Sequence, residues 1–360
     1  MSGRISTFAA PLQQEYLLQS MNSQLNTLTA ENSSGLKSNP AAAMGDNAAL
    51  LYSLQMQADQ QNTLQTTATN AGNQLDAMQT ALTSMASSVQ TIATATINTA
   101  STTPEGQVAL ADEASSTMSQ VLDLLNTQYA GSALFAGDAQ SSPPMQSANA
   151  TGGPVDAVNT ILNNAVAANG GQPLTSANVA SLLSGPDGLS SVFSNTNSNP
   201  ALNYNSAFYT APDDGKPTTV PIGLNQTLQY NVKGNQPAFS DLLQGLSMLS
   251  MLSAPSTQLD STAKAAILTQ ATTMIGQAQN ELTTTQGQLG AVQAQLSQVS
   301  TAQQNAANNT TQQISTMESV DPVAAATKLS ALQNQLEASY QVTSQLSQLT
   351  LSHYLPTLMG

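Results

Sequence analysis

The chain has 360 residues, with 20 acidic and 6 basic side chains, so its formal net charge is −14 at pH 7. This balance excludes a basic nucleic-acid-binding protein, which needs a positive surface to meet phosphates. There is no Cys, no Trp and a single histidine, His353. Zinc clusters, thiol nucleophiles and Cys/His catalytic pairs are therefore excluded as well.

Uncharged polar residues dominate the remainder, because Ser, Thr, Asn and Gln make up roughly two fifths of the chain. Hydrophobic residues at 40% suffice for cores in two or three domains, and aromatic residues at only 4% predict cores of Leu, Met, Val and Ala. No apolar stretch approaches the ~18 residues of a membrane span. Gln13, Gln14 and Glu15 interrupt the start before a secretory hydrophobic region could form, so we expect a soluble protein without a cleavable signal.

Residues 1 to about 140 hold few prolines and three apolar seams. The strongest seam has heptad spacing and predicts a long helix over 46–100. It consists of Leu75, Met78, Leu82, Met85, Val89 and Ile92, in which Met78 and Met85 are interpreted as core-filling. The two shorter seams are Leu18, Met21, Leu25 and Leu28, and Met118, Leu122, Leu125 and Tyr129.

Residues 141 to about 240 are rich in proline and aromatic residues and predict a mixed α/β region. Residues 224–232 alternate apolar and polar side chains as a half-buried strand does, and Asp213-Asp214-Gly215 indicates a turn. Short helices are expected over 155–168 and 175–183.

From residue 241 the helical pattern returns, and no proline interrupts the chain between Pro255 and Pro322. This predicts a second long helix over 262–318, similar in length to the first. Its seam is Leu282, Leu289, Val292, Leu296 and Val299, and a closing helix continues with Leu329, Leu332, Leu336, Tyr340, Val342, Leu346 and Leu349. Two long helices of similar length on either side of an insert predict an antiparallel hairpin whose tip carries the insert.

The flanks of these seams are Gln, Ser, Thr, Asn and Ala, where soluble coiled coils carry Glu, Lys and Arg. Residues 1–40 and 320–360 contain few large apolar side chains. The free energy gained by burying them is smaller than the cost of the backbone entropy lost on folding. We therefore expect both ends to be labile in the monomer and to become ordered helices when many copies pack together. The alternative is an intramolecular bundle that is folded at all times.

Several motifs resemble the flagellin superfamily, and within it the hook-associated proteins that join hook to filament. The start Arg4-Ile5-Ser6-Thr7 resembles that of the junction proteins, and Ser33-Ser34-Gly35 followed by Asn39-Pro40 resembles the turn after the first helix. Residues 129–137 (YAGSALFAG) are similar to the signature that closes the N-terminal helical half, and 231–239 (NVKGNQPAF) to the return into the C-terminal half. Residues 321–355, with the core Leu336-Glu337-Ala338-Ser339-Tyr340, resemble the closing helix.

This resemblance implies terminal helices that form an inner tube, long central helices that surround it, and an insert that faces solvent. It also implies export through the flagellar type III channel without a cleavable signal, and an export chaperone on the C-terminal helix. The implied partners are hook-associated proteins, flagellin and further copies in a ring. The family's surface ion pairs are not implied here, because Ala43-Met44-Gly45-Asp46 replaces its usual paired acids and Ser132 and Ala133 stand where Arg and Tyr are common.

Residues with catalytic potential have simpler structural interpretations. His353 beside Asp321 or Glu337 suggests a metal or acid–base pair, but a single histidine in a helical tail is far more often structural. Gly131 to Gly137 lacks the Lys-Ser/Thr of a phosphate loop, and Asp213-Asp214-Gly215 lacks the spacing of a calcium loop. We predict no catalytic, cofactor or metal residues.

The fold expected is mainly α: an elongated antiparallel helical hairpin or coiled-coil bundle from both termini, with a mixed α/β insert. Its parts are terminal helices (1–45 and 319–360), a long bundle (46–140 and 241–318) and the insert (141–240). The expected function is that of a structural, extracellular flagellar subunit joining hook to filament, with a divergent or minor flagellin as the alternative. An enzyme on a flagellin-like frame and a surface adhesin are further alternatives. The predicted interface residues are Leu18, Met21, Leu25, Leu28, Leu329, Leu332, Leu336, Tyr340, Leu346 and Leu349.

Overall fold

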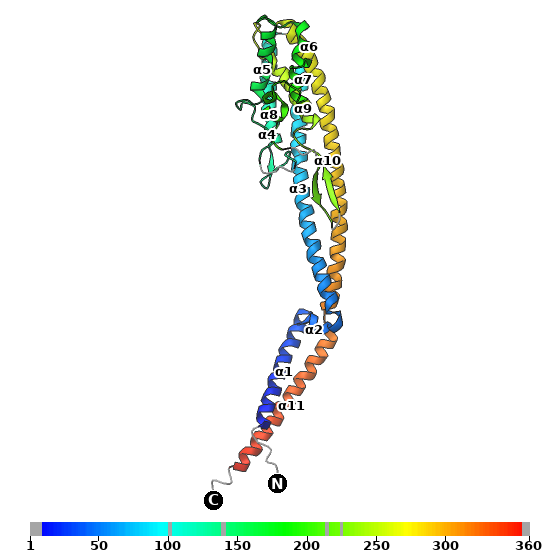
Figure 1. Cartoon of the computed structure of the whole chain (residues 1–360). Helices are drawn as coiled ribbons and strands as arrows, with labels where there is room; N and C mark the ends of the chain where they lie inside the picture. Colours follow the sequence, from blue (N-terminus) through cyan, green and yellow to red (C-terminus); the bar gives the residue numbers. More distant parts are fainter. Residues whose placement is uncertain (1–8, 100–102, 138–141, 213–215, 224–225, 355–360) are drawn as a thin grey trace. The chain divides into compact units, whose positions relative to one another are not determined.

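The computed structural model describes residues 9–99, 103–137, 142–212, 216–223 and 226–354 (Figure 1). The side chains of residues 9–11, 99 and 346–354 are also outside the description. The start Arg4 to Thr7, the turn Asp213 to Gly215, and the side chains of Leu346, Leu349 and His353 thus lie outside the described part of the chain.

The fold is mainly α-helical, with long helices near both termini, as the sequence predicts. The long elements are α1 (Ala9–Ser34), α3 (Ala48–Thr99), α4 (Pro104–Leu125), α9 (Pro237–Ser250), α10 (Ser261–Glu318) and α11 (Pro322–Tyr354). The short helical elements are α2 (Pro40–Met44), η1 (Gly45–Asn47), α5 (Pro154–Ala168), α6 (Ser176–Ser184), α7 (Leu189–Phe193), η2 (Pro200–Leu202), α8 (Tyr204–Ala207) and η3 (Met251–Ser253). The strands are β1 (Gln128–Tyr129), β2 (Ser132–Ala133), β3 (Thr218–Pro221) and β4 (Thr227–Tyr230).

Prolines mark where several helices begin. Pro40, Pro104, Pro154 and Pro237 each occupy one of the first two helical positions, where the missing N–H would have no intrahelical partner. The Thr103 hydroxyl accepts a hydrogen bond from the Gly106 N–H at 3.1 Å and so caps α4. Asp260 caps α10 in the same way, because Oδ1 accepts a bond from the Ala263 N–H at 2.8 Å. Prolines in the first turn and N-capping side chains therefore determine where these helices begin.

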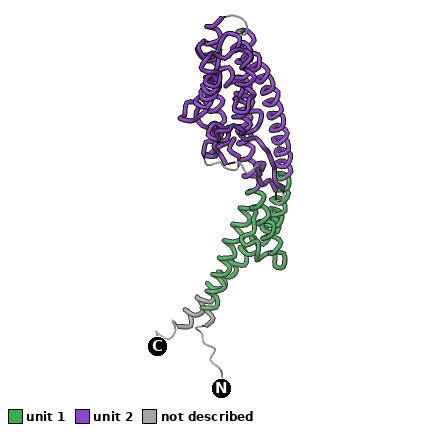
Figure 2. The backbone as a smooth tube through the Cα atoms, turned by 45° about the horizontal axis from the view of Figure 1, so that its top comes forward, with its two compact units in different colours: residues 1–63, 303–360 green, residues 64–302 purple. Residues whose placement is uncertain are grey.

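The chain divides into two compact units, coloured separately in Figure 2. Unit 1 comprises residues 1–63 and 303–360, and unit 2 comprises residues 64–302. Both boundaries fall inside long helices, α3 and α10.

Within unit 2, the strongest predicted seam is confirmed as core. All six seam residues of α3, from Leu75 to Ile92, are at most 1% exposed. Gln279 Nε2 of α10 donates a hydrogen bond to Gln90 Oε1 of α3 at 3.1 Å, and Gln293 Nε2 of α10 donates one to Asp76 Oδ1 of α3 at 2.7 Å. Later residues of α10 thus meet earlier residues of α3, so the two helices run antiparallel here, as predicted.

The centre of unit 2 is α9, which packs against α4. Most residues of α9 are buried, including Phe239 and Leu242 at 0% exposure. The Phe135 ring meets Phe239 edge to face, with centroids 5.7 Å apart. The core is therefore partly aromatic, whereas the composition predicted aliphatic packing, because the few aromatic residues gather in this unit.

The middle region contains the expected short helices and one hairpin. Helices α5 and α6 confirm the predictions over 155–168 and 175–183 to within a residue at each end. The strand expected over 224–232 is shorter, because only Thr227–Tyr230 pairs, antiparallel to Thr218–Pro221. Strand β3 was not predicted, since Pro217 and Pro221 at its ends hide its β-pattern.

Tyr129 is the one member of the third seam that the structure moves elsewhere. Met118, Leu122 and Leu125 are buried on α4, but that helix ends at Leu125 and Tyr129 lies in β1. Ala130 and Gly131 then adopt φ of +50° and +82° and turn the chain from β1 into β2. The glycine-rich stretch is thus a hairpin that follows the helix.

Candidate assembly interface on the terminal helices

Helices α1 and α11 pack against each other within unit 1 and share a small apolar core. Met21 of α1 and Leu332 and Leu336 of α11 are buried, at 4%, 8% and 7% exposure. Leu25 and Leu28 pack against them while partly exposed. This core holds only a few large side chains for two helices of 26 and 33 residues.

Polar contacts at both ends of the α1–α11 pair show the relative orientation of the two helices. Gln14 Nε2 near the start of α1 donates a hydrogen bond to Thr343 Oγ1 of α11 at 2.7 Å. At the far end, the Lys37 N–H donates to the Glu318 carbonyl at 2.8 Å, and the Val320 N–H donates to the Gly35 carbonyl at 2.9 Å. The two helices are therefore antiparallel.

In the turn that follows α1, charged side chains of unit 1 bond to backbone groups near the helix ends. Gly35 has φ of +72°, a left-handed conformation that ends α1 without strain. The Lys37 ammonium donates to the Met317 carbonyl at 2.7 Å, a cation at the negative end of α10. Glu31 Oε1 accepts a bond from the Ser38 N–H at 2.9 Å. These contacts fix the turn after the first helix.

The structure brings together only part of the predicted interface set. Met21, Leu332 and Leu336 form the core between the two helices, with Leu25 and Leu28 against it. Leu18 and Leu329 are half-buried, and Tyr340 is 50% exposed. Leu346 and Leu349 lie where side chains are not described. Most of the described seam residues are therefore packed between α1 and α11 of the same chain.

The seam pattern missed exposed apolar residues near the start of α1, and it did not predict that Val342, a member of the closing seam, would be exposed. The largest exposed fractions near the α1 start belong to Tyr16 at 72% and Leu17 at 54%, followed by Leu12 at 46%. On α11, Val342 is 51% exposed. The sequence did contain a signal for these exposed residues, because apolar residues stand next to seam positions, as Leu17 stands next to Leu18. Such neighbours make the apolar face of the helix wider than contact with one partner helix requires.

These residues border a groove between the two helices, with a volume of about 740 Å³. We call it the terminal groove. It is lined by Gln13, Gln14, Tyr16, Leu17 and Ser20 of α1 and by Gln335, Ala338, Ser339 and Val342 of α11. Every described side chain that lines it is uncharged, so the groove offers apolar contact and neutral hydrogen bonds.

The described residues hold no group of three or more His, Cys, Asp or Glu side chains placed to bind a metal ion. Over the same residues, no helix combines the length and apolar character needed to cross a membrane.

Comparison with known proteins finds two family matches. Residues 5–140 match the family described as the bacterial flagellin N-terminal helical region, and residues 272–355 match the bacterial flagellin C-terminal helical region. Together the two matches cover more than half of the chain. No curated protein sequence matches it.

Among solved structures, one match is a candidate flagellar hook-associated protein from Vibrio parahaemolyticus. The two chains share 12% identity with a TM-score of 0.40, over 73% of this chain and 96% of the other. A similarity this distant carries no inference about function.

Proposed function

The chain belongs to the flagellin family of structural flagellar proteins, and on that premise we propose that it is the subunit that joins the hook to the filament. In this role it assembles as a ring of equivalent copies, with hook-associated proteins on one side and flagellin on the other. Contacts that differ on the two sides need heterologous, head-to-tail surfaces. The start Arg4-Ile5-Ser6-Thr7 and the low charge favour the junction role over a filament flagellin.

The terminal groove is the observation that carries the assembly role. Tyr16, Leu17 and Val342 expose apolar area beside it, and burying that area against another helix would be favourable. Charge repulsion between copies would be weak there, although each chain has a net charge of −14. Apart from His353, the only residues of helices α1 and α11 with side chains that are charged near neutral pH are Glu15, Glu31, Lys328 and Glu337.

The small core between α1 and α11 supports the view that assembly orders the terminal helices. A pair held by so few buried side chains is close to the stability limit for isolated helices. Burial of the terminal groove against neighbouring copies adds the missing apolar contacts. The terminal segments, proposed as 1–45 and 319–360, then form the inner tube, while the insert faces solvent.

An export chaperone is the proposed partner of α11 before assembly, with export through the flagellar type III channel to the cell exterior. Leu332 and Leu336 are covered by α1, so a chaperone that binds them requires the two helices to separate. A chain truncated near Asp321 should lose chaperone binding and assembly together in a pull-down. Retained chaperone binding would refute this part of the proposal.

Two valines of α11 provide a matched test of the terminal groove. Val342 lines the groove and is 51% exposed, whereas Val323 is 74% exposed and is not among the lining residues. In cells lacking the native gene, Val342→Ser should impair filament attachment and motility, while Val323→Ser should restore both. Both variants should have unchanged thermal unfolding as purified chains. Equal behaviour of the two variants in cells would exclude the groove as an assembly surface.

Deletion of the gene separates the junction role from the flagellin alternative. With a missing junction, electron microscopy should show intact hooks without filaments, and flagellin should accumulate in the medium. With a missing minor flagellin, filaments should be short or absent without shed flagellin, and the junction proposal would then be wrong.

A further inference from the structure

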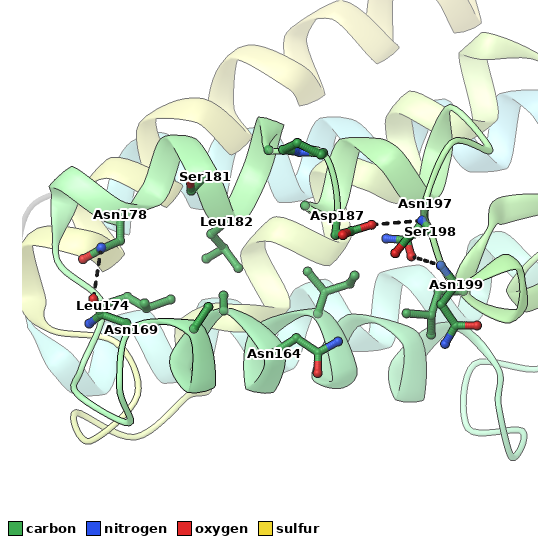
Figure 3. Close-up of a pocket in the computed structure, with 17 residues that line it drawn as sticks. Asn164, Asn169, Leu174, Asn178, Ser181, Leu182, Asp187, Asn197, Ser198 and Asn199 are labelled. Atoms are coloured by element: carbon green, nitrogen blue, oxygen red, sulfur yellow. Dashed lines mark hydrogen bonds between the residues drawn. The ribbon is translucent and has the colours of Figure 1, made fainter.

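A second cavity lies in the middle region of unit 2, between α5, α6 and the two loops around Asp187 and Ser198. We call it the insert cleft. Its volume is about 500 Å³, within the ~300–1,000 Å³ typical of small-molecule sites. Figure 3 shows Asn164 and Asn169 on one side of the cleft and Asn178, Leu182 and Asp187 on the other.

The base of the insert cleft is apolar and firmly packed. Ile161, Leu174, Leu182 and Leu202 line it, and each is at most 9% exposed. All four belong to the large core cluster of unit 2. The floor is therefore a continuation of a close-packed interior and is preorganised for a ligand.

The loops that form the rim are held by specific contacts. Asp187 Oδ1 accepts a hydrogen bond from the Ser198 N–H at 2.9 Å. Bonds from the Ser198 hydroxyl and backbone keep the pKa of Asp187 below its ordinary value, so it is a carboxylate at neutral pH. A Cβ on Gly188 would come within 2.7 Å of the Leu182 carbonyl oxygen, so only glycine fits that part of the wall.

Three lining side chains have hydrogen-bonding groups that no other described residue uses. The Asn164 amide and the Ser181 hydroxyl have no hydrogen bond to the described residues, and Asn199 uses its Oδ1 but not its Nδ2. An amide and a hydroxyl each offer both a donor and an acceptor. A ligand whose groups also donate and accept, as hydroxyls do, matches this set.

The charge of the lining residues limits which classes of ligand the cleft can bind. Among the described residues, Asp187 is the only charged one that lines the insert cleft, and no Lys or Arg lines it. Phosphates, carboxylates and acidic sugars would therefore meet a carboxylate without a compensating cation. We propose that the insert cleft binds an uncharged carbohydrate, with its hydroxyls on the amide and hydroxyl rim and its C–H face on the apolar floor.

No aromatic side chain of the described part of the chain lines the cleft, so the proposed binding lacks ring stacking and should be weak, with a Kd of ~1 mM. Saturation-transfer NMR suits this range. The full-length chain would be tested with lactose, maltose and N,N′-diacetylchitobiose, alongside sialyllactose as an anionic probe and spermidine as a cationic one. At least one neutral disaccharide should show transfer, and sialyllactose should show less.

Three variants decide whether such binding occurs in the cleft. Ala168→Trp should fill the cleft from its exposed edge, and Asn164→Ala removes an unused amide, so each should weaken the signal at least about 5-fold. Asn205→Ala, an exposed asparagine of the same region outside the lining, should leave it unchanged. Circular dichroism would verify that each variant is folded.

The proposal is overturned if no neutral disaccharide binds, if spermidine alone binds, or if the cleft variants bind as well as the native chain. These outcomes are independent of hook–filament assembly, which is read from cells and filaments.

Discussion

The two units bury their apolar side chains to very different extents. In unit 2, one continuous core runs from Ala68 of α3 to Leu296 of α10 and includes the buried apolar side chains of α9. In unit 1, the cluster between α1 and α11 has three buried residues, while Tyr16, Leu17 and Val342 remain exposed. Both units use the same kinds of residues at similar spacing. From this contrast we expect unit 2 to be stable as a single chain, and the proposed assembly role predicts that the terminal helices of unit 1 depend on a partner.

Hydrogen exchange tests this contrast most directly, and the expected effect is the largest. In dilute monomer, amides of α1 and α11 should exchange about 100-fold or more faster than those of α4 and α9, because local opening of a small core costs less free energy. Exchange followed by mass spectrometry resolves these segments. Equal protection of both units would contradict the dependence of the terminal helices on assembly.

Truncation of core leucines sharpens the comparison. Leu242→Ala removes a side chain that is 0% exposed and should lower the free energy of unfolding by about 2–5 kcal/mol. Leu332→Ala, at 8% exposure in unit 1, should leave the main unfolding transition almost unchanged. Urea denaturation followed by circular dichroism measures both. A comparable loss in both variants would mean that the two units unfold cooperatively.

Two glycines test how closely unit 2 is packed. A Cβ on Gly245 of α9 would lie 2.9 Å from Ile275 Cγ1 of α10, so Gly245→Ala should cost about 1–3 kcal/mol. A Cβ on Gly276 meets nothing within 4 Å, so Gly276→Ala should stabilise by about 0.5–1 kcal/mol through helix propensity. Thermal unfolding would show opposite shifts. If Gly245→Ala did not destabilise the protein, α9 and α10 would be less tightly packed than the structure shows.

The smallest expected effect concerns two partly buried carboxyl groups in unit 2. Burial raises the pKa of Asp241, and burial together with the nearby Asp241 charge raises the pKa of Glu281. The folded state therefore holds protons that the unfolded state has lost, and the pair's contribution to stability falls as pH rises through the ordinary carboxyl range.

Glu281→Gln should raise the midpoint of unfolding slightly at pH 7 and reduce its change between pH 4 and pH 7. Glu281 Oε2 is buried without a hydrogen-bond partner among the described residues, which fits a charge that is costly to hold. Glu113→Gln, at an exposed position of α4, is the control. An unchanged pH profile for Glu281→Gln would show that its charge is solvated.

Regular helices were predictable because their signals are local. The heptad seam of α3 and the proline-free run of α10 predicted both helices to within a few residues, and α5 and α6 followed from short apolar periods. Strand β3 and helices α7 and α8 were not predicted. Each is four or five residues long and is held by distant contacts, such as the Tyr204 hydroxyl that donates to the Gly234 carbonyl at 2.7 Å.

The candidate interface was predictable only in part. The sequence identified Met21, Leu332 and Leu336 as apolar seam residues, but a seam does not specify which helix covers it. In the structure α1 and α11 cover each other's seams, so the available surface is the terminal groove, with Tyr16 and Val342 at its edge. The insert cleft was not predicted at all, because its residues are separated by up to 41 positions, from Ile161 to Leu202.

By itself, the sequence determined the helical class, the approximate ends of α3 and α10, the scarcity of charge on the terminal segments and the motifs of the flagellin family. These depend on residue type and short-range spacing, which the chain carries whatever its folded state. Tertiary structure alone decided which apolar residues are covered, which remain exposed, and where cavities open. Those properties depend on contacts between segments hundreds of residues apart, such as Gln14 with Thr343, and no local pattern encodes them.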